Sequence, residues 1–211
     1  AIIIALLLDQ EIRCKGLIRS ISILPWALPT TIMALGWRWI FNSPYGPIET
    51  FLKLFNIGSI NILSNPDTAW LATVVADIWK TTPFVAIILL AGLQTVPNDL
   101  YEAFKLEGGN QTQSFFSITL PLLRPYILLG LIFRAAQAFG VFDLIQVMTG
   151  GGPAGSTESV AYYAYLNALR YLDFGYSSTI MIASFILLIS LILIITFMIN
   201  ESNRINSYLK S

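Results

Sequence analysis

The sequence has 211 residues, of which 55% are hydrophobic and only 11% are charged, and its 12 basic and 12 acidic residues leave no net charge. A soluble domain carries about 25% charged residues, so this composition favours lipid as the solvent and gives no basic field for nucleic acid. Histidine is absent and Cys14 is the single cysteine. Histidine-based metal sites, Ser-His-Asp triads and disulfides within the chain are therefore excluded.

The first eight residues, Ala-Ile-Ile-Ile-Ala-Leu-Leu-Leu, are apolar, and Asp9 follows them. A transmembrane helix needs about 20 apolar residues, so this segment is too short to cross a bilayer. No basic region precedes it and no small-residue cleavage site follows it, so the pattern is not that of a signal peptide. We interpret residues 1–8 as part of a transmembrane helix and expect the sequence to be N-terminally incomplete.

Further along the chain, apolar segments long enough to span a bilayer cover residues 18–41, 70–92, 122–148 and 177–199. The runs Asn42-Ser-Pro-Tyr-Gly-Pro47 and Gly150-Gly-Gly-Pro-Ala-Gly155 predict irregular backbone outside the hydrocarbon. The sequence therefore predicts one all-α, polytopic membrane domain over residues 1–211.

Lysine and arginine are distributed unequally between the two sides of the predicted membrane. Residues 9–19, residues 93–124 and the tail after Asn200 contain seven of them, whereas residues 42–69 and 149–176 contain two. Cytoplasmic loops carry an excess of these residues, so the first set is predicted to be cytoplasmic.

Two predicted spans carry polar side chains at helical spacing. In the first, the positions i, i+3, i+4 and i+7 are Asp77, Lys80, Thr81 and Phe84. In the second, the same spacing is repeated by Arg134, Gln137, Ala138 and Val141. Charge inside a bilayer is costly and marks a function or an ion pair. Either the two faces line a pathway for a polar solute, or Asp77 and Lys80 neutralise each other and Arg134 pairs with a carboxylate elsewhere.

The predicted cytoplasmic loop, residues 93–121, contains the signals of a short helix. Pro97 and Asn98 precede Asp99, which suits the first turn of a helix. Gly108 and Gly109 suit its end, where left-handed backbone is needed. Taken alone, this pattern predicts a capped amphipathic helix on a membrane surface.

The same loop resembles the cytoplasmic signature of permease subunits of binding-protein-dependent ABC importers. That signature runs Glu-Ala-Ala, three residues, Gly, nine residues, Ile, one residue and Leu-Pro. This chain has Glu102-Ala103-Phe104, three residues, Gly108, nine residues, Ile118, Thr119 and Leu120-Pro121, so every spacing matches. The departure is Phe104 at the second alanine, which affects how that side of the helix packs.

The resemblance implies a type I ABC importer permease (MetI-like) transmembrane fold in the cytoplasmic (inner) membrane. It implies that residues 98–109 form a coupling helix that docks on an ATP-binding subunit dimer. It further implies a second homologous permease subunit and an extracytoplasmic solute-binding protein as partners. The coupling residues it implies are Glu102, Ala103, Gly108, Leu120 and Pro121.

No P-loop motif occurs in the sequence, so no cofactor is expected on this chain. ATP and Mg²⁺ are expected on the partner subunit, and the chain is not expected to be an enzyme.

A second resemblance, to the maltose-type and glycerol-phosphate-type carbohydrate branch, implies a sugar or a sugar-derived solute. In maltose-type relatives, sugar contacts come from the two helices with the polar faces. The segments that carry the resemblance are Trp-Arg-Trp-Ile-Phe at residues 37–41, Tyr45-Gly46, Thr149-Gly-Gly-Gly-Pro153, Ser156-Thr157, Tyr162-Tyr163 and Phe174-Gly175-Tyr176.

Two alternatives remain open at the level of sequence. The first is an ABC permease for another solute class, such as an amino acid, a peptide or an ion. The second is an intramembrane enzyme that uses Asp77 and Asp143 as acid and base.

Overall fold

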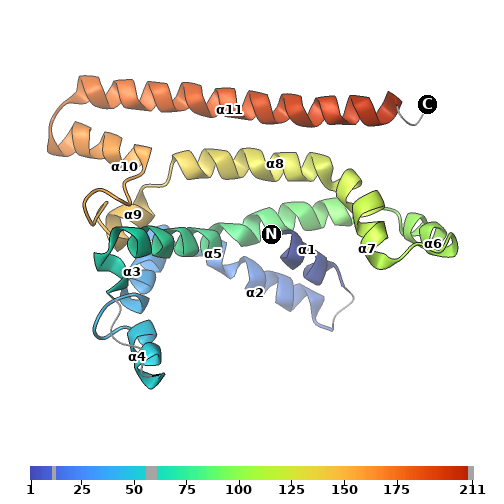
Figure 1. Ribbon diagram of the computed structural model, residues 1–211, viewed down its shortest axis with the longest axis horizontal. Helices are drawn as coiled ribbons and strands as arrows, with labels where there is room; N and C mark the ends of the chain where they lie inside the picture. Colours follow the sequence, from blue (N-terminus) through green and yellow to red (C-terminus); the bar gives the residue numbers. More distant parts are fainter. Residues whose placement is uncertain (11–12, 56–60, 209–211) are drawn as a thin grey trace. The chain divides into compact units, whose positions relative to one another are not determined.

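The computed structural model describes residues 1–10, 13–55 and 61–208, and all regular structure in these ranges is helical. Side chains are described as far as residue 198. Figure 1 shows the elements in order. The α-helices are α1 (Ile2–Asp9), α2 (Lys15–Ala27), α3 (Thr30–Ile40), α4 (Pro47–Leu54), α5 (Pro66–Leu93), α6 (Asn98–Leu106), α7 (Gln111–Ser114), α8 (Leu120–Phe139), α9 (Asp143–Met148), α10 (Val160–Tyr165) and α11 (Phe174–Tyr208).

Shorter irregular helices complete these elements. A 3₁₀ helix, Ile62–Ser64, precedes α5. Two π-helical turns, Phe115–Thr119 and Leu166–Arg170, follow α7 and α10. Because the first π turn runs from α7 into α8 without a break, Gln111–Phe139 is one continuous helical segment.

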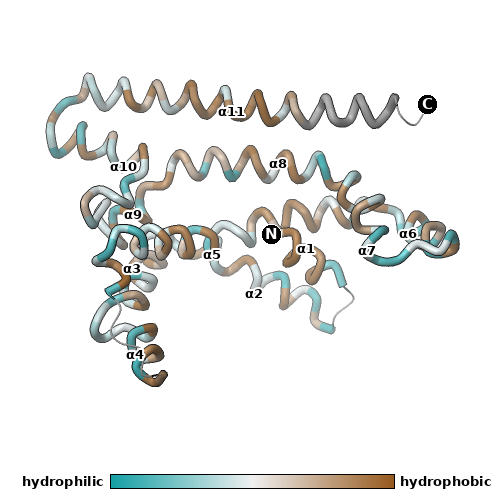
Figure 2. The backbone as a smooth tube through the Cα atoms, in the orientation of Figure 1, coloured by the Kyte–Doolittle hydropathy of each residue, from teal (hydrophilic) through white to brown (hydrophobic). Residues whose placement is uncertain are grey.

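Within the described residues, three helical segments are long and apolar enough to cross a membrane, namely Pro66–Leu93, Gln111–Phe139 and Phe174–Met198. Figure 2 shows α11 pale near its start and mostly hydrophobic further along, as far as its described side chains extend. Most of these side chains are also exposed, which suits a helix whose surroundings are lipid.

The predicted span at residues 18–41 is a bent pair of helices in the structure. Helices α2 and α3 meet at an angle of 87°, and the break falls at Leu28 and Pro29. Proline lacks a backbone N–H and disfavours helical backbone at the residue before it, so Pro29 separates the two helices. Among the described residues, α2 and α3 are long and apolar enough for a fourth span only if the two helices are taken together.

The predicted span at residues 122–148 also differs from the structure, because α8 ends at Phe139 and α9 begins at Asp143. Gly140 follows the last residue of α8, and Asp143 stands in the first turn of α9, where an anion is favoured. The helix is therefore interrupted before the predicted end of the span.

The chain forms two compact units, and each unit combines separate segments of the sequence. The first comprises Ala1–Trp26, Thr81–Ala135 and Ile189–Ser211. In its core, α1 packs against the second half of α5 and the start of α8. The buried side chains are Ala5, Leu8, Leu89, Leu90, Leu93 and Leu123.

The second unit comprises Ala27–Lys80 and Ala136–Leu188. Its main core lies between α3, the first half of α5 and α9. Alanine side chains on α3 and α5 are completely or almost completely buried, which allows close approach of the helices. The buried core residues are Met33, Ala34, Phe41, Ala72, Ala76, Leu144 and Met148.

Candidate functional site

Helix α6 carries the first half of the matched signature and has defined ends. Pro97 precedes it with extended backbone, and Asp99 lies in its first turn. At the other end, the Gly108 N–H donates to the Lys105 carbonyl at 3.1 Å. Gly108 has a φ of +86°, a conformation that glycine adopts without strain. The sequence signals for both ends of this helix therefore coincide with its actual ends.

The outward face of α6 is accessible. Glu102 and Ala103 are both exposed. Leu100 and Leu106 are 44% and 90% exposed. This short helix therefore presents a carboxylate between apolar side chains, a combination suited to contact with another protein.

Two contacts hold α6 against the segment that follows it. The Tyr101 hydroxyl and the Thr119 Oγ1 lie 3.0 Å apart in a hydrogen bond, and Thr119 is buried. The Phe104 ring lies on Gly109, where a Cβ atom would clash with the ring. The residue that departs from the family signature is thus accommodated by a glycine five positions later.

The second half of the signature lies where the chain re-enters a long helix. Asn110 and Gln113 form a capping box at α7, with hydrogen bonds of 2.8 and 3.0 Å. Leu120 and Pro121 are half-buried and are the first two residues of α8. An open pocket of about 380 Å³ separates this segment from the end of α6, and it is lined by Phe104, Glu107, Gly108, Gly109, Gln113 and Ser117.

Glycines bring the long helices beside this segment close together, a feature that the sequence analysis missed. A Cβ atom at Gly92 of α5 would lie 2.8 Å from the Leu123 side chain of α8, and the Tyr126 ring is nearer still. A Cβ at Gly130 would lie 3.0 Å from Val85. Glycine within an apolar span is the sequence signal that could have indicated this contact.

The residues of the candidate pathway are divided between the two compact units. In the second unit, Asp77 and Lys80 are half-buried on α5. Lys80 Nζ donates a hydrogen bond of 2.6 Å to the Leu28 carbonyl, at the break between α2 and α3. Lys80 also interacts electrostatically with Asp143 at the start of α9. Lys80 therefore interacts with the break before α3 and with the start of α9, both in its own unit.

In the first unit, Phe84 lies between two aromatic side chains. It stacks on Trp26 with ring centroids 5.1 Å apart and an interplanar angle of 14°. It also meets Phe133 edge-on at 5.5 Å. Trp26 and Phe133 are 40% and 44% exposed, so this group presents aromatic surface to which two residues outside the predicted faces contribute. Thr81, on the same helix, is buried at 8% exposure.

Of the four residues predicted to share the second helical face, three lie on α8 and one does not. Arg134 and Gln137 are half-buried on α8, and Ala138 is exposed on the same helix. Val141 lies beyond Phe139, outside the helix, so the spacing i to i+7 does not apply to it. The Oε1 atom of Gln137 is buried and accepts no hydrogen bond from the described residues.

The Thr149-Gly-Gly-Gly-Pro153 segment forms a closed loop. The Thr149 and Thr157 hydroxyls are 2.7 Å apart, and Thr157 donates to the Gly152 carbonyl at 3.0 Å. The φ angles of Gly150 and Gly151 are +62° and +82°. This irregular backbone is stabilised by its own hydrogen bonds, and the sequence pattern of turn formers is explained.

Long apolar helices that carry polar groups, with a short helix between two of them in the sequence, are the features of a polytopic membrane protein. The chain belongs to the family of binding-protein-dependent transport system inner membrane components, whose model matches residues 1–204. The predicted resemblance and the location in an inner membrane are confirmed by this match.

Two curated relatives have names that refer to sugars. The chain is 44% identical over 186 residues to the trehalose/maltose transport system permease protein MalF of Thermococcus litoralis, covering 88% of this chain and 63% of that protein. It is 39% identical over 184 residues to the sulfoquinovosyl glycerol transport system permease protein SmoG of Agrobacterium fabrum, covering 87% and 60%. The chain therefore spans less than two thirds of the length of these relatives.

A solved structure confirms the fold. A chain in the crystal structure of a bacterial ABC transporter involved in the import of the acidic polysaccharide alginate matches with a TM-score of 0.84 at 20% identity. The match covers 95% of this chain and 71% of that chain. Together with the family, it confirms the predicted all-helical, MetI-like permease fold.

Proposed function

We propose that the chain is a permease subunit of an ABC importer that moves a sugar or a sugar-derived solute across the inner membrane. The observation that carries the proposal is the signature at residues 102–121, because its first half lies on an exposed, capped helix. A rigid short helix can transmit motion from a partner to the long helices that flank it.

In this proposal α6 docks on an ATP-binding subunit. Glu102 accepts a charge-assisted hydrogen bond from the partner, and the small Ala103 allows close approach. Gly108 permits the turn after α6, while Leu120 and Pro121 begin the helix that receives the motion. The pocket at the end of α6, about 380 Å³, is large enough to accept a side chain of the partner.

The proposed partners follow from the family and from the absence of a P-loop in the sequence. ATP and Mg²⁺ are bound and ATP is hydrolysed by the dimeric ATP-binding subunit, so this chain is not itself an enzyme and holds no cofactor. A second homologous permease completes the pathway, and an extracytoplasmic binding protein delivers the solute.

The solute class rests on the two sugar-named relatives and on the chemistry of the pathway residues. Sugars combine hydroxyls with apolar ring faces, so a path for them needs both polar groups and aromatic surface. Gln137 has a buried acceptor atom, and Trp26, Phe84 and Phe133 supply aromatic surface. Asp77, Lys80, Thr81, Arg134, Ala138 and Val141 are the remaining proposed pathway residues.

The test uses the full-length permease, assembled with its ATP-binding subunit, second permease and binding protein in proteoliposomes. Glu102→Ala is expected to lower solute uptake about tenfold or more while ATP hydrolysis continues. Asp67→Ala is the matched control, because Asp67 is an exposed carboxylate at the start of α5, outside the signature. Unchanged uptake in Glu102→Ala would remove the docking role from α6.

The same vesicles test the solute class. Stimulation of ATP hydrolysis by a sugar-loaded binding protein is expected. Stimulation only by an amino acid, a peptide or an ion would replace the sugar with the alternative solute class while leaving the coupling role in place.

A further inference from the structure

Helix α4 buries a charged side chain and exposes apolar ones, which is the reverse of a surface helix in a water-soluble protein. Its inward side includes Ile48, which packs against the core of the second unit, and Glu49, which is only 3% exposed. A carboxylate is almost never fully buried unless it is paired. The buried face of α4 therefore contains the charge that a soluble helix would expose.

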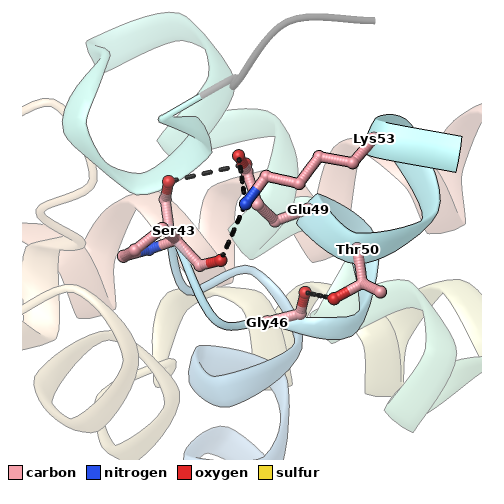
Figure 3. Close-up of polar contacts among 6 residues, drawn as sticks. Ser43, Gly46, Glu49, Thr50 and Lys53 are labelled. Atoms are coloured by element: carbon pink, nitrogen blue, oxygen red, sulfur yellow. Dashed lines mark hydrogen bonds and ion pairs between the residues drawn. The ribbon is translucent and has the colours of Figure 1, made fainter. Parts of the chain in front are cut away.

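The polar side chains of this helix make hydrogen bonds and one ion pair within its own turn, as Figure 3 shows. Ser43 Oγ donates to Glu49 Oε2 at 3.4 Å, and Lys53 Nζ lies 3.8 Å from Glu49 Oε1. Lys53 Nζ also donates to the Pro44 carbonyl at 3.4 Å, and Thr50 Oγ1 donates to the Gly46 carbonyl at 3.2 Å. Glu49 Oε1 accepts no hydrogen bond from the described residues, so the Lys53 ammonium supplies its compensating charge. Local pairing of this kind suits surroundings that offer few hydrogen-bond partners.

The outward side of α4 is apolar and aromatic. Phe51, Leu54 and Phe55 are 60%, 76% and 62% exposed, and the two phenylalanine rings are 4.9 Å apart. Tyr45, in the preceding turn, is 82% exposed. Contiguous apolar surface of this kind marks a membrane or protein contact.

The neighbouring elements of the same unit point to the membrane. Helix α4 contacts α3, near whose end Trp39 is 59% exposed. Trp70, near the start of α5, is 55% exposed. Exposed tryptophans at the ends of spanning helices mark the boundary between lipid headgroups and acyl chains, so α4 follows a helix end that already lies at this depth.

We infer that α4 is an interfacial helix that lies in the headgroup region of the bilayer, with lipid as the occupant of its apolar face. Phe51, Leu54 and Phe55 enter the acyl chains, and the Lys53 ammonium stays at headgroup level beside Glu49. A protein partner is the less suitable occupant, since protein interfaces form about one hydrogen bond per 100–200 Å² and the side-chain hydrogen bonds and ion pair of α4 are made within its own turn. This inference does not depend on the solute or on the coupling role.

The inference can be tested with nitroxide spin labels on the full-length permease, assembled in its complex in liposomes. Cys14 is replaced by serine, and single cysteines are introduced as Phe51→Cys and Leu54→Cys. Glu158→Cys, in an exposed loop, is the aqueous control, and Phe185→Cys, 61% exposed on α11, is the lipid control. Collision with oxygen, which concentrates in lipid, is compared with collision with a water-soluble nickel complex.

Labels at residues 51 and 54 are expected to collide more with oxygen than with the nickel complex, at a depth of about 5–10 Å. Nickel accessibility equal to that of the Glu158 control would show an aqueous helix and would overturn the inference. Protection from both reagents would show a protein contact and would overturn it as well. Agreement between the two positions guards against a local effect of one label.

Discussion

Lys80 Nζ donates a hydrogen bond of 2.6 Å to the carbonyl oxygen of Leu28, the residue directly before Pro29. The carbonyls at the end of a helix have no partner within that helix, so a side-chain donor at this break satisfies one of them. The side chain that the sequence suggests as a pathway residue therefore stabilises the bend between α2 and α3.

The Lys80→Met variant is expected to unfold at lower temperature, because the Leu28 carbonyl loses this donor. The expected loss is about 1–3 kcal/mol, the cost of an unsatisfied buried polar group. Thermal unfolding of the detergent-solubilised complex measures it. Lys80→Arg is the control, since it keeps a cationic donor. A fall in uptake without any change in unfolding temperature would assign Lys80 to the pathway alone.

Substitutions at Phe104 and Gly109 are expected to compensate for each other, because the two residues are in contact. Gly109→Leu places a side chain where the Phe104 ring lies, so we expect uptake per ATP hydrolysed to fall severalfold as α6 shifts. Phe104→Ala restores the alanine of the family signature and vacates that space. The double variant is therefore expected to recover coupling that the single Gly109→Leu variant loses.

The measurement is the ratio of solute transported to ATP hydrolysed in proteoliposomes, for both single variants and the double variant. If the losses of coupling in the two single variants simply added in the double variant, the proposed packing of Phe104 against Gly109 would be contradicted.

The Gln137→Leu variant tests whether Gln137 contacts the solute or stabilises the fold. The buried Oε1 of Gln137 accepts no hydrogen bond from the described residues, so an apolar replacement is expected to leave the unfolding temperature unchanged or raise it. If a solute hydroxyl donates to this atom, the KM for uptake rises by about tenfold, equivalent to about 1.4 kcal/mol. Uptake assays over a range of concentrations measure this, and an unchanged KM would remove Gln137 from the pathway.

Two neighbouring glycines form a matched pair for testing the loop at residues 149–157. Both have positive φ, but a Cβ at Gly150 would meet nothing within 4 Å, whereas a Cβ at Gly151 would lie 2.7 Å from the Tyr162 ring. Gly150→Ala is expected to cost about 1 kcal/mol from backbone strain alone. Gly151→Ala is expected to cost more, because it adds a steric clash.

Hydrogen exchange of the loop amides distinguishes the two variants, with faster exchange expected in Gly151→Ala. Equal exchange in both would show that Tyr162 moves aside.

The class of this protein could be predicted from its composition, because lipid as a solvent leaves a strong mark on composition. Runs of apolar residues indicated α5 and α11, and the signature from Glu102 to Pro121 indicated the segment between long helices. The ends of α6 were also predictable, since Pro97, Asp99 and Gly108 act through local backbone geometry and charge.

How these local elements meet could not be predicted from the sequence and is visible in the three-dimensional structure. The stacking of Trp26 on Phe84 depends on residues far apart in sequence. The role of Lys80 depends on Leu28, 52 positions away, and the burial of Glu49 depends on how its turn folds back. Helical periodicity shows which residues share a face, but it cannot show which carbonyl or ring lies opposite, because that choice is made by contacts between elements.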